Sequence, residues 1–267
     1  MYSISNIESS FYGVNFAKMN DTDFKNYIII YQEIKKLEEI NTIKKIAIKN
    51  SIDILNYVKK ITQKLNNKLK ISHQEIHDVA LEYIIRAILL NQTFIENVKI
   101  YINRLNVQQK KEVNSWIYKN ESLQFFRILR NYTYHNTIPI STSTMTWNVL
   151  LKKYEDIKVI LLRNMLIDNI EKNGRDVKFI NILKNNLDEE INLVDYFEGW
   201  IKEINSLYKM ILKFVSENLT DNIKIFNEKF YNSFISTNGY VVDIHENGTY
   251  DKYIIDKDIF RDIVNYI

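Results

Sequence analysis

Glycine and proline are scarce in this chain, and their scarcity limits how often regular structure is interrupted. The 267 residues include five glycines and one proline, Pro139. Because these two residues are the strongest helix breakers, long uninterrupted helices are favoured over short strands joined by tight turns. With 46% hydrophobic residues, a chain of this length also has enough apolar material for a substantial core. The sequence therefore predicts a mainly α-helical globular protein.

Apolar periodicity locates the expected helices. From Asp21 to about Asn106, apolar residues recur at intervals of three and four, which predicts three long helices. Helix starts near residues 22 and 73 are indicated by Asp21 and by Ser72, which forms a capping-box pattern with Glu75. Further helices are expected at residues 107–118, 121–134, 166–186 and 193–234, the last broken near residues 218–221. Residues 140–153 look extended, and residues 157–163 are ambiguous between strand and helix.

The last thirty residues follow a different pattern. Two short β-rich runs, at residues 240–244 and 253–255, flank an Asn247-Gly248 pair that tolerates the positive φ of a hairpin turn. A final helix is expected at residues 257–267. No internal repeat or low-complexity linker divides the remainder. We therefore expect a helical domain at residues 1–237 and a C-terminal β-hairpin with a short helix at residues 238–267.

Composition narrows the possible chemistry. The chain contains no cysteine, which excludes disulfides, thiolate metal sites and cysteine nucleophiles, and fits a reducing compartment. The net charge of +3 is too small to indicate nucleic-acid binding unless the charges cluster locally. No apolar stretch is long enough to span a bilayer, and no signal-like N-terminus is present. A cytoplasmic location without a membrane partner is expected.

Arg130 and His135 form the most suggestive combination of side chains, at the end of the helix expected at residues 121–134. Metal-free RNA cleavage needs a group that moves protons and a permanent cation that stabilises phosphate charge, and these two residues supply both. Five residues correspond to roughly 140° around an ideal helix, so one helix does not bring the two side chains together. Asn131 lies four residues before His135 on the same face and can orient its imidazole. Helix fraying or a second copy of the chain must complete such a site.

Residues 130–135, Arg-Asn-Tyr-Thr-Tyr-His, resemble the HEPN superfamily motif, in which arginine is followed by a polar residue and, after four to six residues in all, by histidine. The resemblance implies a HEPN-like helical bundle that cleaves RNA as a homodimer, without metal or other cofactor. It also implies a toxin–antitoxin or abortive-infection (antiphage) role, with an antitoxin protein as partner. Carried over by position, His135 is the acid–base, Arg130 the phosphate clamp and Asn131 the orienting group.

Two details qualify this resemblance. The HEPN variant that partners small nucleotidyltransferases often has tyrosine two positions after the histidine, where this chain has Thr137. Residues 126–140 also resemble uncharacterised bacterial proteins with a Leu-Arg-Asn-Tyr…His…Pro pattern. A simpler role is open as well, because Arg130 and His135 can cap the carbonyls of a helix C-terminus and interact with its dipole.

A lysine cluster offers a second functional hypothesis. Residues 41–70 contain eight lysines and one acid, Asp53. Such a helix can bind phosphates, although a solvated lysine face is the simpler interpretation. The expected RNA contacts are Lys59, Lys60, Lys64 and Arg127. The corresponding alternative function is a non-catalytic helical module that binds RNA or a partner protein.

Metal chemistry has less support in the sequence. His73 and His77 have the spacing of two ligands on one helical face, but the order His-Gln-Glu-Ile-His differs from the zinc-protease motif and a third ligand is missing. His245 lies beside the expected hairpin turn, where we expect it to face solvent. No glycine-rich phosphate loop is present. We therefore assign no metal or nucleotide site.

Overall fold

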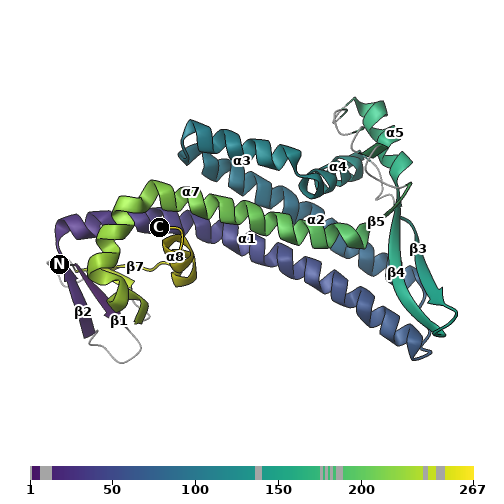
Figure 1. The fold of residues 1–267 in the computed structure, drawn as a ribbon, viewed down its shortest axis with the longest axis horizontal. Helices are drawn as coiled ribbons and strands as arrows, with labels where there is room; N and C mark the ends of the chain where they lie inside the picture. The colour runs from purple at the N-terminus through teal and green to yellow at the C-terminus, as the bar shows by residue number, and fades with distance from the viewer. Residues whose placement is uncertain are drawn as a thin grey trace. The chain divides into compact units, whose positions relative to one another are not determined.

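The computed structural model describes residues 2–6, 14–135, 140–174, 177, 180, 183–184, 189–236, 240–244 and 250–267. The chain is mainly α-helical, as expected (Figure 1). Its helices are α1 (Asp21–Asn66), α2 (His73–Tyr101), the 3-10 turn η1 (Ile102–Arg104), α3 (Val107–Lys119), α4 (Glu121–His135), α5 (Arg163–Asn173), α7 (Leu193–Ser236) and α8 (Lys257–Val264). Its strands are β1 (Tyr2–Asn6), β2 (Val14–Met19), β3 (Ile140–Asn148), β4 (Lys153–Leu162), β5 (Glu190–Asn192), β6 (Tyr240–Ile244) and β7 (Tyr250–Tyr253).

The two longest helices are less interrupted than the sequence suggested. Two helices and a short 3-10 turn replace the three helices expected before Asn106, because α1 runs unbroken for 46 residues without a glycine or proline. The expected break at residues 218–221 is also wrong. Leu219 and Ile223 are buried there, and the Thr220 hydroxyl bonds to the Ser216 carbonyl at 2.8 Å, so polar residues are accommodated within α7.

The helix α2 begins where the capping pattern of Ser72 and Glu75 predicted a helix start. Ser72 is the N-cap residue, and its side chain accepts a hydrogen bond from the Glu75 backbone N–H at 3.0 Å. This bond satisfies one of the amide groups that a helix start leaves without a partner. Because α1 starts at Asp21 and α2 at His73, the helix starts expected near residues 22 and 73 are confirmed.

Residue contacts divide the chain into two compact units. Unit 1 comprises residues 1–41, 104–109 and 208–267, and unit 2 comprises residues 42–103 and 110–207. Each unit thus draws on α1, α3 and α7. This division differs in kind from the expected boundary near residue 237, which stays a prediction.

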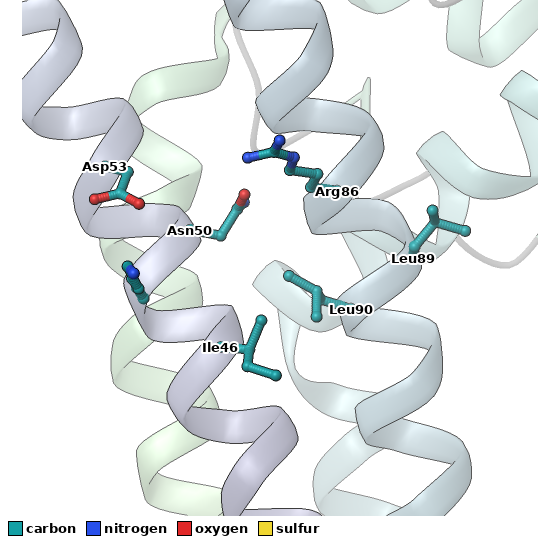
Figure 2. Close-up of a pocket in the computed structure, with 7 residues that line it drawn as sticks. Ile46, Asn50, Asp53, Arg86, Leu89 and Leu90 are labelled. Carbon is teal, nitrogen blue, oxygen red and sulfur yellow. The ribbon is translucent and has the colours of Figure 1, made fainter.

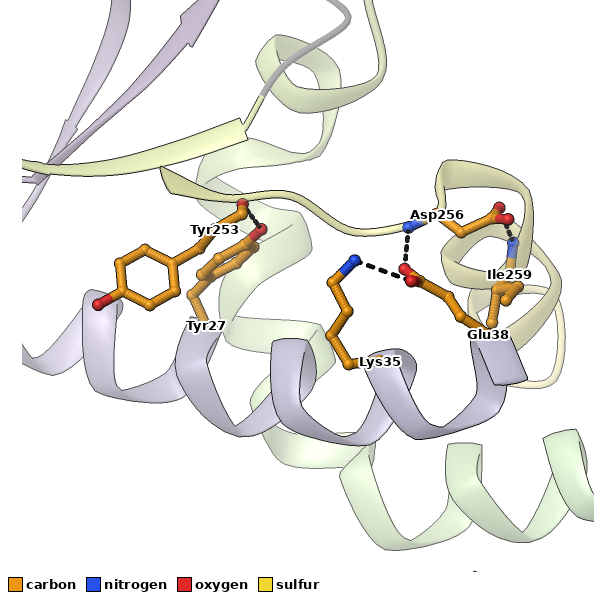
Figure 3. A network of polar contacts seen from close by, with 6 residues as sticks. All are labelled: Tyr27, Lys35, Glu38, Tyr253, Asp256 and Ile259. Carbon is orange, nitrogen blue, oxygen red and sulfur yellow. Dashed lines mark hydrogen bonds and ion pairs between the residues drawn. The ribbon is translucent and has the colours of Figure 1, made fainter. Parts of the chain in front are cut away.

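Unit 1 contains a four-stranded antiparallel sheet in the order β2-β1-β6-β7. The expected C-terminal hairpin is present as β6 and β7, although β7 is Tyr250–Tyr253 and not residues 253–255 as expected. Two N-terminal strands that the sequence did not predict extend it to a four-stranded sheet. Its turn, with Asn247, Gly248 and His245, lies outside the described residues. In Figure 3 the Tyr27 hydroxyl donates to the Tyr253 carbonyl at 2.8 Å, and Glu38 accepts from the Asp256 backbone N–H at 3.0 Å. These bonds attach the segment between β7 and α8 to α1.

Unit 2 contains the three-stranded antiparallel sheet β3-β4-β5. Residues 140–153 are largely extended, as expected, and residues 157–162 belong to a strand. Buried Val58 and Ile61 of α1 pack with Ile76 of α2 and Ile157 of β4. Figure 1 shows the β3–β4 hairpin running from the α4 side of the unit to the C-terminal end of α1. The hairpin therefore runs between the end of α4 and the lysine-rich end of α1, two regions that no sequence pattern linked.

Candidate functional site

The candidate site lies at the C-terminal end of α4, whose first turn is fixed by side-chain amides. The expected helix is confirmed as Glu121–His135. Asn120 accepts from the Leu123 backbone N–H at 3.0 Å. Buried Asn91 of α2 donates to the Leu123 carbonyl at 3.3 Å and accepts from the Trp200 indole N–H of α7 at 2.9 Å. One buried amide therefore joins three helices at the base of α4.

Aromatic packing holds the buried face of α4. The Phe126 ring centroid lies 4.8 Å from that of Trp200 and 5.5 Å from that of Phe197. Phe125 stacks on Tyr196 with centroids 3.8 Å apart. Burial, followed by the nearby charges of two carboxylates, raises the pKa of Tyr196 to about 12. Such packing gives α4 a defined orientation, which a preorganised site requires.

A close backbone approach completes the contact between α4 and α7. A Cβ atom on Gly199 would lie 2.8 Å from the Ser122 Oγ, so glycine lets the two helices approach at this point. Gly199 is thus a packing residue, although it lies inside a helix where glycine is ordinarily unfavourable.

The last turn of α4 alternates between the core and solvent. Tyr132 is buried and burial raises its pKa, whereas Arg130 is exposed and Asn131 is half-buried. The Thr133 hydroxyl donates to the Arg130 carbonyl at 3.0 Å, which supplies a partner near the helix end. No carboxylate in the described part of the chain pairs with the Arg130 guanidinium. An anchored backbone therefore presents an accessible cation to an incoming anion.

His135 belongs to α4 by its backbone, but its side chain lies outside the described residues. Residues 136–139, including Thr137 and Pro139, lie outside them too. Helical backbone through residue 135 supports the expected angular offset of roughly 140° between Arg130 and His135. The distance between their side chains stays a prediction, as does the second copy that would complete the site.

The predicted RNA-contacting residues do not gather at this helix end. Half-buried Arg127 donates to Gln124 at 3.1 Å within α4. Lys59 and Lys60 are exposed and Lys64 is half-buried. All three belong to the last turns of α1, whose Asn66 bonds to Tyr154 near the far end of the β3–β4 hairpin. Because ten-residue β4 spans about 30 Å, Lys64 and the end of α4 lie at opposite ends of this hairpin.

No family model, curated protein or solved structure matches this chain. The HEPN assignment therefore rests on residues 130–135 and their helical context, and it stays a proposal. Within the described residues, none of the helices is long and apolar enough to cross a membrane.

The histidine pair at the start of α2 shows no metal-binding geometry. The His77 Nδ1 lies 3.3 Å from the Asp78 carboxylate, and His73 is exposed. Across the part of the chain that the structure describes, no three histidine, aspartate or glutamate side chains are grouped so that they could hold a metal ion. These residues therefore add nothing to the site at α4.

An open groove of about 470 Å³ lies between α1 and α2 (Figure 2). Arg86 at its edge pairs with Glu82 and lies over the Tyr83 ring, 5.9 Å from its centroid. The groove is lined by Ile46, Lys49, Asn50, Asp53, Arg86, Leu89 and Leu90. This lining contains no histidine, and we assign no catalytic role to the groove.

Proposed function

We propose that this protein is a metal-independent endoribonuclease of HEPN type that acts as a homodimer in toxin–antitoxin or antiphage defence. The observation that carries the proposal is an exposed Arg130 beside Asn131, on the last turn of a helix fixed by buried aromatic and amide contacts. The biological setting and the antitoxin partner rest on the family resemblance.

The proposed reaction is an internal transesterification of RNA. The ribose 2′-oxygen attacks the adjacent phosphorus and the bond from phosphorus to the 5′-oxygen breaks, which leaves a cyclic phosphate and a 5′-hydroxyl. The His135 imidazole of one copy accepts the proton from the 2′-hydroxyl, and the imidazolium that forms returns a proton, through solvent water, to the leaving 5′-oxygen. Arg130 balances charge on the non-bridging oxygens, and Asn131 orients the imidazole.

Cleavage of RNA by the purified chain in the presence of EDTA tests this mechanism. His135→Ala should lower the rate by about 10²–10⁴-fold, because it removes general acid–base catalysis. Arg130→Ala should lower it by about 10²–10³-fold. His73→Ala is the matched histidine control and Arg261→Ala the matched arginine control, since both residues are exposed and neither belongs to α4. Undiminished cleavage by His135→Ala would show that the mechanism is wrong.

A mixing experiment tests the two-copy site separately. If each site combines Arg130 of one copy with His135 of the other, mixing inactive Arg130→Ala and His135→Ala proteins should restore part of the activity through one intact site per heterodimer. Each variant alone should stay inactive. An active monomer, or no recovery after proven subunit exchange, would contradict the composite site.

A non-catalytic RNA-binding module is the second candidate, and the exposed lysines of α1 favour it. In that case RNA binding should survive His135→Ala but weaken on reversal of Lys59, Lys60 and Lys64 to glutamate. The salt dependence of binding should fall in the reversed variant, because fewer counterions are released. Cleavage that depends on His135 would reject this candidate.

A further inference from the structure

The tip of the β3–β4 hairpin exposes three consecutive aliphatic side chains. Val149 is 76% exposed, Leu150 93% and Leu151 59%. Single exposed aliphatic residues are common on protein surfaces, but a contiguous protruding group of them marks an interaction site. None of the groups proposed for RNA cleavage belongs to this tip, so it requires a separate explanation.

This tip has a fixed turn geometry. Asn148 accepts from the Leu151 backbone N–H at 2.8 Å and donates to Glu155 at 2.6 Å. Lys152 completes the turn with a left-handed φ of 49°. Local hydrogen bonding of this kind sets the direction of the aliphatic side chains, so their exposure is built into the turn.

The end of α1 holds the hairpin from the side. The Asn66 amide donates to the Tyr154 carbonyl at 2.9 Å and accepts from the Tyr154 backbone N–H at 2.6 Å, as a neighbouring strand would. Leu69 follows three residues later and is 55% exposed. Because three or four residues reach at most about 14 Å, Leu69 and Leu150 both lie within that distance of this contact.

Lysines flank these aliphatic side chains along the sequence. Residues 60–70 and 148–158 together contain seven lysines and two acids. The lysines are Lys60, Lys64, Lys68, Lys70, Lys152, Lys153 and Lys158. The next acids along the chain are Glu75 and Asp78, in the first turns of α2. The occupant of this surface should therefore be both anionic and able to take up aliphatic side chains.

Two kinds of occupant fit this combination of lysines and exposed aliphatic side chains less well than a lipid bilayer does. A second copy would bring lysines together, and a few aliphatic side chains cover far less than the roughly 800 Å² per partner of a stable interface. RNA would match the lysines, but aliphatic side chains have no π-face on which bases can stack. An anionic phospholipid bilayer satisfies both requirements, since its headgroups attract lysine and its acyl boundary accepts leucine.

We propose that residues 149–153, together with Leu69 and its flanking lysines, bind the surface of an anionic phospholipid bilayer. The expectation that this chain has no membrane partner rested on the lack of a spanning segment, and surface binding needs none. Val149, Leu150 and Leu151 enter the headgroup–acyl boundary while the lysines contact phosphate and carboxylate groups. The proposal does not depend on RNA cleavage.

Vesicle sedimentation with the full chain tests the proposal. The protein should bind vesicles of phosphatidylcholine mixed with phosphatidylserine, should bind pure phosphatidylcholine far more weakly, and should be released by salt. Leu150→Ser with Leu151→Ser should lower the partition coefficient at least about tenfold. Lys152→Gln with Lys153→Gln should lower it by about tenfold or more. Ile100→Ser is the matched control, because Ile100 is 70% exposed on α2, and it should leave binding unchanged.

A second measurement does not depend on a weakened variant. Leu150→Trp keeps the tip apolar, and its fluorescence should shift to shorter wavelength and be quenched by brominated lipids when anionic vesicles are added. Absence of wild-type binding to anionic vesicles, or binding that Leu150→Ser with Leu151→Ser leaves intact, overturns the proposal. If these serine substitutions instead abolish RNA binding or dimerisation, while the wild type ignores vesicles, the tip belongs to that partner and the lipid assignment is wrong.

Discussion

Replacing Asn91 with alanine tests whether a buried amide determines the position of α4. The substitution leaves the buried Trp200 indole N–H without its acceptor and removes one donor to the Leu123 carbonyl. An unsatisfied buried polar group costs about 1–3 kcal/mol, and the small void adds roughly 1 kcal/mol. The free energy of unfolding of unit 2 should therefore fall by about 2–4 kcal/mol, which corresponds to a Tm lower by about 5–15 °C.

Intrinsic fluorescence is a suitable probe for this measurement. All three tryptophans, Trp116, Trp147 and Trp200, belong to unit 2, so emission during urea unfolding reports on that unit. Asn97→Ala on the same helix is the control, since its half-buried amide bonds only to the Thr93 carbonyl within α2. That variant should change stability by less than about 0.5 kcal/mol. Equal effects of the two variants would refute the argument.

Asn91→Asp tests the direction in which stability changes with pH. A buried carboxyl bonded to a carbonyl is favoured in its neutral form, so its folded pKa should lie above its unfolded value of about 3.9. The variant should then be nearly as stable as the wild type below the unfolded pKa and should lose stability as pH rises through the folded pKa. A loss in the opposite direction, or one that does not change with pH, would show that residue 91 is not enclosed as described.

Three further predictions concern neighbouring contacts in unit 2. The Tyr196 pKa is raised from 10.0 to about 12, so the neutral phenol stabilises the fold below pH 10 and this contribution disappears between pH 10 and 12. When urea unfolding midpoints are measured against pH, Tyr196→Phe should lose less stability over this range than the wild type. Gly199→Ala should be tolerated poorly alone, but with Ser122→Ala it should gain about 0.5–1 kcal/mol from helix propensity, which thermal unfolding would show. Asn66→Ala should speed hydrogen exchange at the Tyr154 amide without changing exchange at Leu123, and equal rates at Tyr154 would contradict the proposed attachment of the hairpin.

Local patterns predicted the helices of this chain better than their ends and interruptions. The periodicity and caps gave α3, α4 and the start of α2, because those signals act over three or four residues. The expected break near residues 218–221 failed because Leu219 and Ile223 are buried and Thr220 finds a partner in the preceding turn. The strands β1 and β2 were missed because β1 pairs with β6, more than 200 residues away, and five-residue runs carry little pattern of their own.

At the candidate site too, the sequence predicted local features but not those that depend on residues far away in the chain. The sequence indicated Arg130 and Asn131 through their spacing and helix-end position, and the structure places them on an anchored last turn. It did not indicate Asn91, because an asparagine on an apolar helix face becomes informative only when Trp200 arrives from 109 residues away. The exposed tip was missed for a related reason. Val149-Leu150-Leu151 resembles core sequence until the turn and the Asn66 contact direct it to solvent.

If both proposals hold, the β3–β4 hairpin separates RNA cleavage from membrane contact. The hairpin begins a few residues after His135 and ends at the aliphatic tip, and the ten residues of β4 span about 30 Å. The potential of an anionic bilayer decays over roughly 8 Å at physiological salt, so it would be weak at the base of the hairpin. RNA should therefore reach Arg130 on vesicle-bound protein about as readily as on free protein. A cleavage rate that falls severalfold on anionic vesicles, and recovers with Leu150→Ser and Leu151→Ser, would show instead that the two surfaces interfere.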